Sequence, residues 1–369
     1  MAEPLKNSFG PDIPGLIADM VTAAYPAFDR DRFVRDCLVE YDSLELTPRA
    51  RRIADALGDH LPDDRGQALS IITASLGPEI EQAELTGMES FRYLPFVYFV
   101  ADEGLDHFEL AMAAQYELTK RFTAEFSIRA YLETYPKETL ARLREWAGDE
   151  NVHVRRLVSE GSRPRLPWAP RLRTFQADPG PVIELLEMLK DDDQEYVRRS
   201  VANNLNDISK DHPDLVADIA GRWLNGASPE RRRLIRHGLR TLIKQGHLGA
   251  LAVLGYGPES PVRIADVRID PLTVAIGGKV RITIDLENPE PDTHGGLVDL
   301  IVHFIKANGS VSAKVFKGGE RTLEGHARTT VSKTISLQQH STRTHHAGTH
   351  VVEIQLNGTI YPAGGFELT

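Results

Sequence analysis

VHVRRLVSEGSRPRLPW (residues 152–168) and YVRRSVANNLND (residues 196–207) are two copies of nearly the same helical sequence. The tripeptide Val-Arg-Arg at 154–156 recurs 43 residues later at 197–199, and another Arg-Arg pair follows after a further 34 residues. Repeats of this length, with two helices each, are typical of HEAT-like solenoids. In both copies the arginines precede a helix end that carries a carboxylate, Glu160 in the first and Asp207 in the second.

Helical periodicity extends outward from this repeat, from Pro11 to about Tyr256. Apolar residues recur at spacings of three and four, and short polar or proline-bearing turns separate the segments. Met88–Val100 is the most apolar and aromatic segment, which indicates a buried helix that Pro95 starts or kinks. We expect four helix pairs after it: 110–121 with 125–134, 137–146 with 152–159, 182–189 with 195–208, and 213–224 with 229–243.

The chain changes character at GYGPESP, residues 255–261. Beyond it, apolar residues alternate with period two, as in KVRITIDLE at 279–287, and turn signals such as Asn308-Gly309 and Asn357-Gly358 separate the segments. About seven short strands in this length predict an immunoglobulin-like sandwich. A closed barrel is the competing architecture, because no cysteine pair marks the sandwich. We therefore expect an all-α HEAT-like repeat solenoid over residues 1–256 and an all-β immunoglobulin-like sandwich over 257–369.

Charge is distributed unevenly along the 369 residues. Lysines and arginines number 15 against 28 acids in residues 1–150, 17 against 13 in 151–256, and 11 against 12 in 257–369. A basic middle third in a protein of net charge -10 is the pattern expected of a phosphate-binding surface. Arginines that only solvate helix faces are the alternative.

The remaining bulk features indicate where the protein works. Neither end resembles a targeting signal, and no stretch approaches the roughly 18 to 20 apolar residues that span a bilayer. The single cysteine, Cys37, excludes an intramolecular disulfide, fits a reducing compartment and is expected to be a buried small residue. We expect a cytoplasmic bacterial protein that works at the nucleoid, without contact to the membrane.

The chain resembles the AlkC branch of the DNA alkylation repair glycosylases, which are built on HEAT-like repeats. The resemblance covers residues 1 to about 256 and is strongest across 122–168 and across EYVRRSVANNLNDISKDHP at 195–213. One subgroup of this branch carries an immunoglobulin-like domain after the repeats. The resemblance implies excision of 3-methyladenine and 3-methylcytosine from duplex DNA in base excision repair, without full base flipping and without a cofactor.

Such chemistry requires anions near the sugar. An alkylated base is cationic and leaves as a neutral molecule, so what remains to be stabilised is an oxocarbenium-like sugar. The resemblance implies that Glu125 and Glu160 contribute to the catalytic pocket. Without it, Glu125 would be a favourable acid at a helix start, whereas Glu160 is poorly placed at a helix end.

Two further residues complete the predicted catalytic set. Asp207 follows an amide-rich run that a purely structural helix rarely contains. It either takes part in catalysis or orients Arg198 or Arg199. Trp168 lies in a proline-bounded loop, where its ring could face a cationic base or cover a core. The resemblance favours the pocket wall for Trp168, while Trp146 and Trp223 occupy helical core positions.

Arginines on successive repeats predict a track for the DNA backbone. Arg156 is the strongest candidate for bracing the duplex beside the lesion. The remaining predicted phosphate contacts are Arg155, Arg163, Arg165, Arg198, Arg199, Arg232, Arg233 and Arg236.

Other site types are less favoured by the sequence. The histidines of HSTRTHHAGTH at 340–350 lack a completing cysteine or acid, which favours a solvated loop over a metal site, and contact of this loop with DNA is a further hypothesis. No lysine stands out in the repeated segment, so lyase activity is not expected. The chain shows no obligate protein partner and is expected to be a monomer. A noncatalytic HEAT-repeat scaffold that binds DNA or protein is the alternative function.

Overall fold

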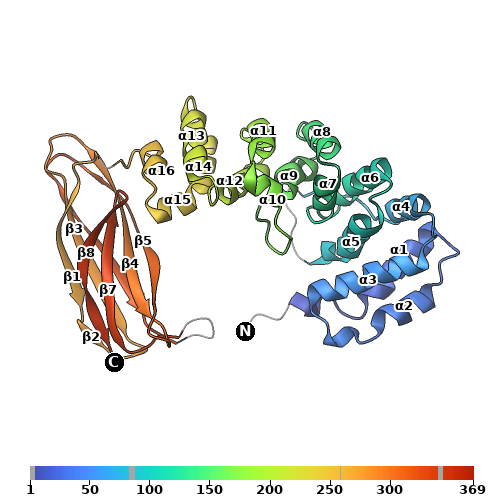
Figure 1. Cartoon of the computed structure of the whole chain (residues 1–369), viewed down its shortest axis with the longest axis horizontal. Coiled ribbons are helices and arrows are strands. Elements are labelled where there is room, and N and C mark those ends of the chain that lie inside the picture. The colour runs from blue at the N-terminus through green and yellow to red at the C-terminus, as the bar shows by residue number, and fades with distance from the viewer. Residues whose placement is uncertain (1–4, 83–87, 258, 340–343) are drawn as a thin grey trace. The chain divides into compact units, whose positions relative to one another are not determined.

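A computed structural model describes residues 5–82, 88–257, 259–339 and 344–369 (Figure 1). Helices occupy the chain as far as Val253, and strands occupy it from Arg263 onward. The all-α part followed by an all-β part confirms the predicted fold class. None of the helices in the described ranges is long and apolar enough to cross a membrane.

The α-helices of the described residues are α1 (Ile13–Ala24), α2 (Arg30–Leu38), α3 (Leu46–His60), α4 (Arg65–Ala74), α5 (Leu94–Glu103), α6 (Phe108–Thr119), α7 (Ile128–Thr134), α8 (Pro136–Trp146), α9 (Val152–Gly161), α10 (Arg173–Ala177), α11 (Gly180–Leu189), α12 (Glu195–Ile208), α13 (Pro213–Leu224), α14 (Pro229–Gly238), α15 (Arg240–Gln245) and α16 (Leu248–Val253). Single 3-10 turns precede α1, α3 and α5, at Leu5–Ser8, Tyr41–Ser43 and Glu89–Tyr93.

The chain forms two compact units. The first unit comprises Met1–Asp211 and Ser228–Gly238, and the second comprises His212–Ala227 and Leu239–Thr369. Helices α13, α15 and α16 thus group with the strands. The predicted division at residue 256 coincides with the change from helix to strand, and as a domain boundary it stays a prediction.

The repeated helices α9 and α12 pack side by side in the first unit, and α14 packs against α12 (Figure 1). Val154 and Val158 of α9 are buried, as are the corresponding Val197 and Val201 of α12, so the repeated valines form the packing face. Between the helices, Asn204 Nδ2 donates to the Ser159 carbonyl at 2.8 Å. The repeat predicted from the sequence is therefore a repeat of packing.

Several predicted helix limits are wrong in detail. The helix expected over 125–134 begins at Ile128, because residues 125–127 form a turn. The helix expected over 229–243 is two helices that meet at Leu239. Pro95 lies in the first turn of α5 and starts that helix without kinking it.

The strands of the second unit form two sheets. They are β1 (Arg263–Asp270), β2 (Thr273–Val274), β3 (Lys279–Glu287), β4 (His294–Ile305), β5 (Val311–Leu323), β6 (Arg328–Ser336), β7 (Gly348–Leu356) and β8 (Thr359–Leu368). One sheet has the order β1-β3-β6 and the other β2-β8-β7-β4-β5. Two separate sheets exclude the closed barrel, and the short β2 adds an eighth strand to the seven that were expected.

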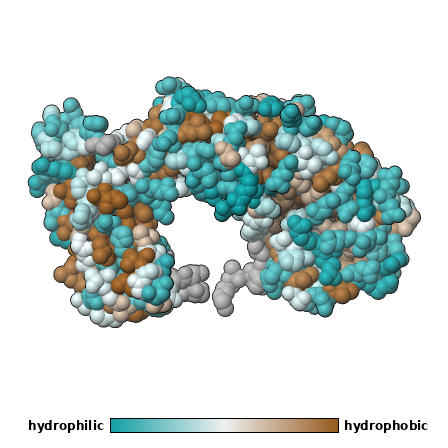
Figure 2. All heavy atoms as spheres, viewed as in Figure 1, coloured by the Kyte–Doolittle hydropathy of each residue, from teal (hydrophilic) through white to brown (hydrophobic). Residues whose placement is uncertain are grey.

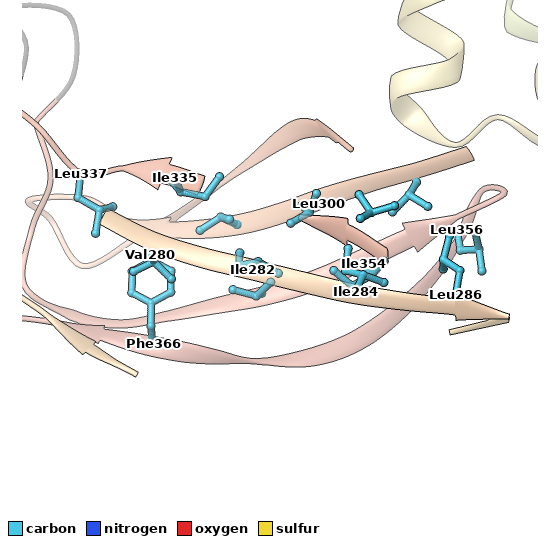
Figure 3. Packing of buried hydrophobic residues seen from close by; sticks show 14 of the residues in the cluster. Val280, Ile282, Ile284, Leu286, Leu300, Ile335, Leu337, Ile354, Leu356 and Phe366 are labelled. Carbon is cyan, nitrogen blue, oxygen red and sulfur yellow. The ribbon is translucent and has the colours of Figure 1, made fainter. Parts of the chain in front are cut away.

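The core of the sandwich follows the period-two pattern read from β3. Val280, Ile282, Ile284 and Leu286 are all fully buried and face residues of the other sheet such as Phe366 (Figure 3). The turn between β7 and β8 places Asn357 and Gly358 at positive φ, as the Asn-Gly signal predicts.

The single cysteine and two of the tryptophans are core residues. Cys37 is fully buried, and burial raises the pKa of its thiol to about 12. Trp146 and Trp223 are 7% and 3% exposed. All three fill apolar positions, as predicted.

Candidate functional site

Six side chains of the first unit form a continuous series of ion pairs. We call it the carboxylate–arginine chain; its members, in order, are Glu125, Arg156, Glu160, Arg163, Asp207 and Lys210. Acids and cations alternate along it, and its links are 2.6 to 3.4 Å long. The three acids predicted to be catalytic are thereby brought to one place.

Glu125 lies at the open end of the carboxylate–arginine chain. Its Oε2 lies 2.6 Å from Arg156 Nη1 and accepts a 3.0 Å hydrogen bond from the Thr123 hydroxyl. Among the described residues, no hydrogen bond or ion pair reaches its Oε1. Its side chain is 13% exposed, more than those of Glu160 and Asp207 at 8% and 2%. Glu125 therefore has a carboxylate oxygen available to a substrate or to water.

Glu160 occupies the centre of the carboxylate–arginine chain. Its Oε1 lies 2.6 Å from Arg163 Nη1 and 3.4 Å from Arg156 Nη2, and its Oε2 accepts a 2.6 Å hydrogen bond from Ser200 of α12. Burial alone would raise the pKa of Glu160, but Arg156 and Arg163 outweigh it and hold that pKa below its usual range. Glu160 is thus an ionised, fully hydrogen-bonded acid, which explains an unfavourable charge at a helix end.

Asp207 is the most buried acid of the set. Its Oδ2 accepts from Arg163 Nε at 2.8 Å, and its Oδ1 accepts from Lys210 Nζ at 3.0 Å. Desolvation lowers the pKa of Arg163, but Glu160 and Asp207 raise it by more, so that guanidinium stays charged between them. Both oxygens of Asp207 are therefore occupied, which favours an orienting role over contact with the reacting atoms.

The end of α9 lies close to the start of α7. Gly161, the last residue of α9, lies so near Ile128 that an added Cβ would be 2.5 Å from its Cγ2. A residue with a side chain would push the two helices apart. This glycine sets the approach that lets Arg156 on α9 reach Glu125 beside α7.

Arg129 of α7 connects the carboxylate–arginine chain to the loop that carries Trp168. It is 4% exposed, and its Nη1 donates to the carbonyls of Gly161 and Arg163 at 3.1 and 2.7 Å. Its Nη2 donates to the carbonyl of Pro170. Burial lowers the pKa of Arg129 to about 10, so it is still charged at neutral pH. The loop is therefore held on both sides of Trp168 by one buried guanidinium.

Trp168 has an unusual environment for a tryptophan. It is 68% exposed and has a φ of 65°, in the left-handed region that residues with a side chain seldom adopt. Together with Tyr98, Phe126 and Leu172 it lines a cavity of 310 Å³. Phe126 follows Glu125 directly, which puts the cavity beside the open end of the carboxylate–arginine chain. Trp168 does not cover a core.

The arginines predicted to contact phosphates differ in their freedom to do so. Arg156 and Arg163 belong to the carboxylate–arginine chain. Arg155 holds both carboxylate oxygens of Asp192 at 2.6 and 3.1 Å, and Arg165 lies 2.6 Å from the carboxylate of Asp211. All four side chains are thus paired with carboxylates of the first unit, and their phosphate contacts stay predictions.

The other five predicted arginines lie on α12 and α14. Arg198, Arg199 and Arg233 line a small pocket of 110 Å³ between these helices. Arg198 donates to the Asp192 carbonyl, and Arg233 pairs with Glu230 at 3.2 Å. Arg232 is exposed and Arg236 half-buried on α14. Their role at DNA likewise stays a prediction.

Three members of the site were missed by the sequence analysis. Lys210, Ser200 and Thr123 bind the predicted acids, but each is an ordinary polar residue in sequence and becomes recognisable only when its partner is placed. Lys210 is an ammonium partner of Asp207, which does not make it a nucleophile.

The histidine segment provides no metal site within the described ranges. His340 and residues 341–343 lie outside them, and no group of three or more possible ligands occurs inside them. His345 and His350 are 3% and 0% exposed, and His350 stacks on Phe366 with ring centroids 5.3 Å apart. The expectation of a solvated loop is wrong for these two residues, because their rings pack into the sandwich.

Comparisons with known proteins show what the chain is similar to. Residues 120–236 match the family model described as DNA alkylation repair enzyme, and residues 263–369 match the C-terminal Ig-like domain of the uncharacterised protein YhaZ. The chain is 32% identical over 365 residues to YhaZ of Bacillus subtilis (strain 168), with 99% of each covered. It is 36% identical to the Pseudomonas fluorescens alkylpurine DNA glycosylase AlkC bound to DNA containing an abasic site analog, with 100% of both chains covered and a TM-score of 0.87.

Proposed function

The chain belongs to the DNA alkylation repair enzymes, on the AlkC branch, and from that membership we propose that it hydrolyses the N-glycosidic bond of cationic N-alkylated bases in duplex DNA. The proposed substrates are 3-methyladenine and 3-methylcytosine, removed in base excision repair without full base flipping. The observation that carries this proposal is a set of three acids on the carboxylate–arginine chain, of which only Glu125 has an oxygen without a partner among the residues that the structure describes.

The proposed reaction needs little acid catalysis. The C1′–N bond breaks, its electron pair goes to the cationic base, and the base leaves as a neutral molecule. The sugar becomes an oxocarbenium ion, to which water adds at C1′ with loss of a proton. A carboxylate stabilises the cation and accepts that proton. Glu125 is the acid assigned to both tasks, because its Oε1 is unoccupied among the described residues.

Glu160 and Asp207 have a different part in this scheme. Both are saturated by their neighbours, so they orient Arg156 and Arg163, and the three acids of the carboxylate–arginine chain balance its three cations. Arg156 orients Glu125 through its hydrogen bond to Oε2. Its guanidinium also lies over the ring of Tyr196, 5.4 Å from the centroid. Trp168 offers an exposed aromatic face to the cationic base.

The deciding experiment is an excision assay on duplex DNA that contains 3-methyladenine or 3-methylcytosine, with the released base measured by mass. Free base and an intact abasic strand are expected. We expect Glu125→Gln to lower the excision rate about 100-fold or more with little effect on duplex binding. Glu138→Gln, which alters an exposed acid on α8, is the matched control and should act as the wild type.

The outcomes separate the two functions considered. Wild-type protein that binds duplex DNA and releases no base would establish the noncatalytic scaffold. Equal losses of binding and excision in Glu125→Gln would instead give this residue a structural role.

A further inference from the structure

Two arginines outside the repeated Val-Arg-Arg element follow Trp168 closely: Arg171 lies in the same loop, and Arg173 is the first residue of α10. We propose that Arg171 and Arg173 bind phosphates of the DNA strand beside the lesion and are a principal cationic contact of the first unit. This inference rests on the proposed function, since it assigns the backbone contact of the same site. Neither residue belongs to a repeat, so the sequence pattern does not mark them.

Arg171 and Arg173 are exposed and available. Within the described part of the chain, no hydrogen bond, ion pair or ring contact engages either guanidinium. The surface over α10 and the preceding loop is strongly hydrophilic (Figure 2). By contrast, the nearby Arg163 is paired with Asp207 and Arg165 with Asp211.

An arginine that is already paired with a carboxylate must give up that pair to bind a phosphate, whereas an unpaired arginine need not. Moving Arg155 to a phosphate would leave the carboxylate of Asp192, whose side chain is 5% exposed, as a buried charge without its counter-ion, which is strongly unfavourable. An arginine without such a partner loses only the conformational entropy of its own side chain on binding. Phosphates therefore recruit Arg171 and Arg173 before Arg155.

The backbone presents the two side chains on one face. Leu172 between them is 3% exposed and has an extended conformation, and neighbouring residues of extended chain point to opposite sides. Arg171 and Arg173 consequently share the outer side. Two residues of extended chain span about 7 Å, which suits two phosphates of one strand.

The segment is anchored on both sides of Arg171. Arg129 holds the Pro170 carbonyl, and the amide of Leu172 donates to the Pro164 carbonyl at 3.2 Å. An anchored loop loses little further entropy on binding. The same short segment also carries Trp168, so a phosphate bound here lies close to the base that Trp168 would contact.

The test measures binding of duplex DNA with an abasic-site analogue against salt concentration, using Arg171→Gln, Arg173→Gln and the double variant. Each lost phosphate contact should reduce the slope of log K against log salt by about 0.9, so the double variant should lose about 1.8. Arg35→Gln on α2 is the matched control, since Arg35 is likewise exposed and unpaired in the described ranges. It should leave the slope unchanged.

Failure of this inference is distinct from failure of the proposed function. A double variant with the wild-type slope overturns the phosphate contacts, even if wild-type protein excises methylated bases. A reduced slope supports them, even if no base is released. An equal loss in Arg35→Gln would show only a general effect of net charge and would also overturn the assignment. Thermal unfolding of all variants should match the wild type, because neither side chain has a partner in the part of the chain that the structure describes.

Discussion

Arg163 donates a 2.8 Å hydrogen bond from Nε to Oδ2 of Asp207, a residue 44 positions further along the chain, and both side chains are almost fully buried. The same guanidinium binds Glu160 through Nη1. One side chain therefore neutralises two acids of different helices, which makes it the central cation of the site.

Arg163→Gln should lower the free energy of unfolding by about 3–5 kcal/mol, because Glu160 and Asp207 would both lose a buried counter-ion. Chemical denaturation at neutral pH measures this loss. Arg165→Gln is the control, since the pair that Arg165 forms with Asp211 is about a fifth exposed and should contribute about 0–1 kcal/mol. Similar small losses in both variants would contradict a central role for Arg163.

Arg129→Lys should loosen the loop around Trp168. A lysine keeps the charge but cannot donate to the carbonyls of Gly161, Arg163 and Pro170 together. We expect faster tryptic cleavage after Arg171 and Arg173 in the native protein, measured by mass spectrometry of timed digests, and slower excision. Unchanged cleavage would show that other contacts hold the loop.

Asp299→Asn should stabilise the second unit at neutral pH. Burial raises the pKa of Asp299 to about 6, despite the amide of Gly318 and the charge of Lys317, whereas an unfolded Asp titrates near 3.9. The stability that its protonated form supplies is present below about pH 3.9 and is lost as the pH rises through about 6.

The variant should therefore be more stable than the wild type at pH 7.5, by at most about 3 kcal/mol, since one pKa unit corresponds to about 1.4 kcal/mol. The difference should shrink towards pH 4. Urea unfolding of both proteins at pH 4.5 and 7.5 gives the comparison, and a difference independent of pH would refute the assigned titration.

Cys37 should be inert in the native protein. Its thiol is fully buried and its pKa is raised to about 12, so the reactive thiolate is scarce at neutral pH. An aromatic disulfide reagent that releases a coloured thiolate should label no thiol in the folded state and one thiol per chain in denaturant. Rapid labelling of the native protein would show that α2 opens readily.

The sequence alone predicted those structural features that follow a repeated local pattern. Val154 and Val197 revealed the repeat because buried positions of successive helices recur with the helix spacing. KVRITIDLE coincides with β3 because each of its apolar residues enters the core. Glu125 and Glu160 could be named from the family resemblance and Asp207 from the amide-rich run before it, and the structure brings the three together.

The sequence alone does not show which acid each arginine pairs with. Arg155 and Arg156 are adjacent and identical in type, yet one holds Asp192 and the other Glu125, because a helix points successive side chains in different directions. Which acid each one meets depends on how helices 30 to 40 positions apart approach. The free oxygen of Glu125 and the free cations at 171 and 173 follow from that pairing and could not be predicted before it was known.

The carboxylate–arginine chain also constrains which substitutions this site can accept. Each member is the counter-ion of its neighbours, so a single substitution exposes an uncompensated charge and its effects on stability and chemistry arrive together. The losses of stability or activity measured for substitutions at two neighbouring members will therefore not be additive. Functional divergence at this site is therefore expected to proceed by compensated pairs, such as an acid and its arginine replaced together, and double-mutant cycles are needed to assign a catalytic contribution to any one residue.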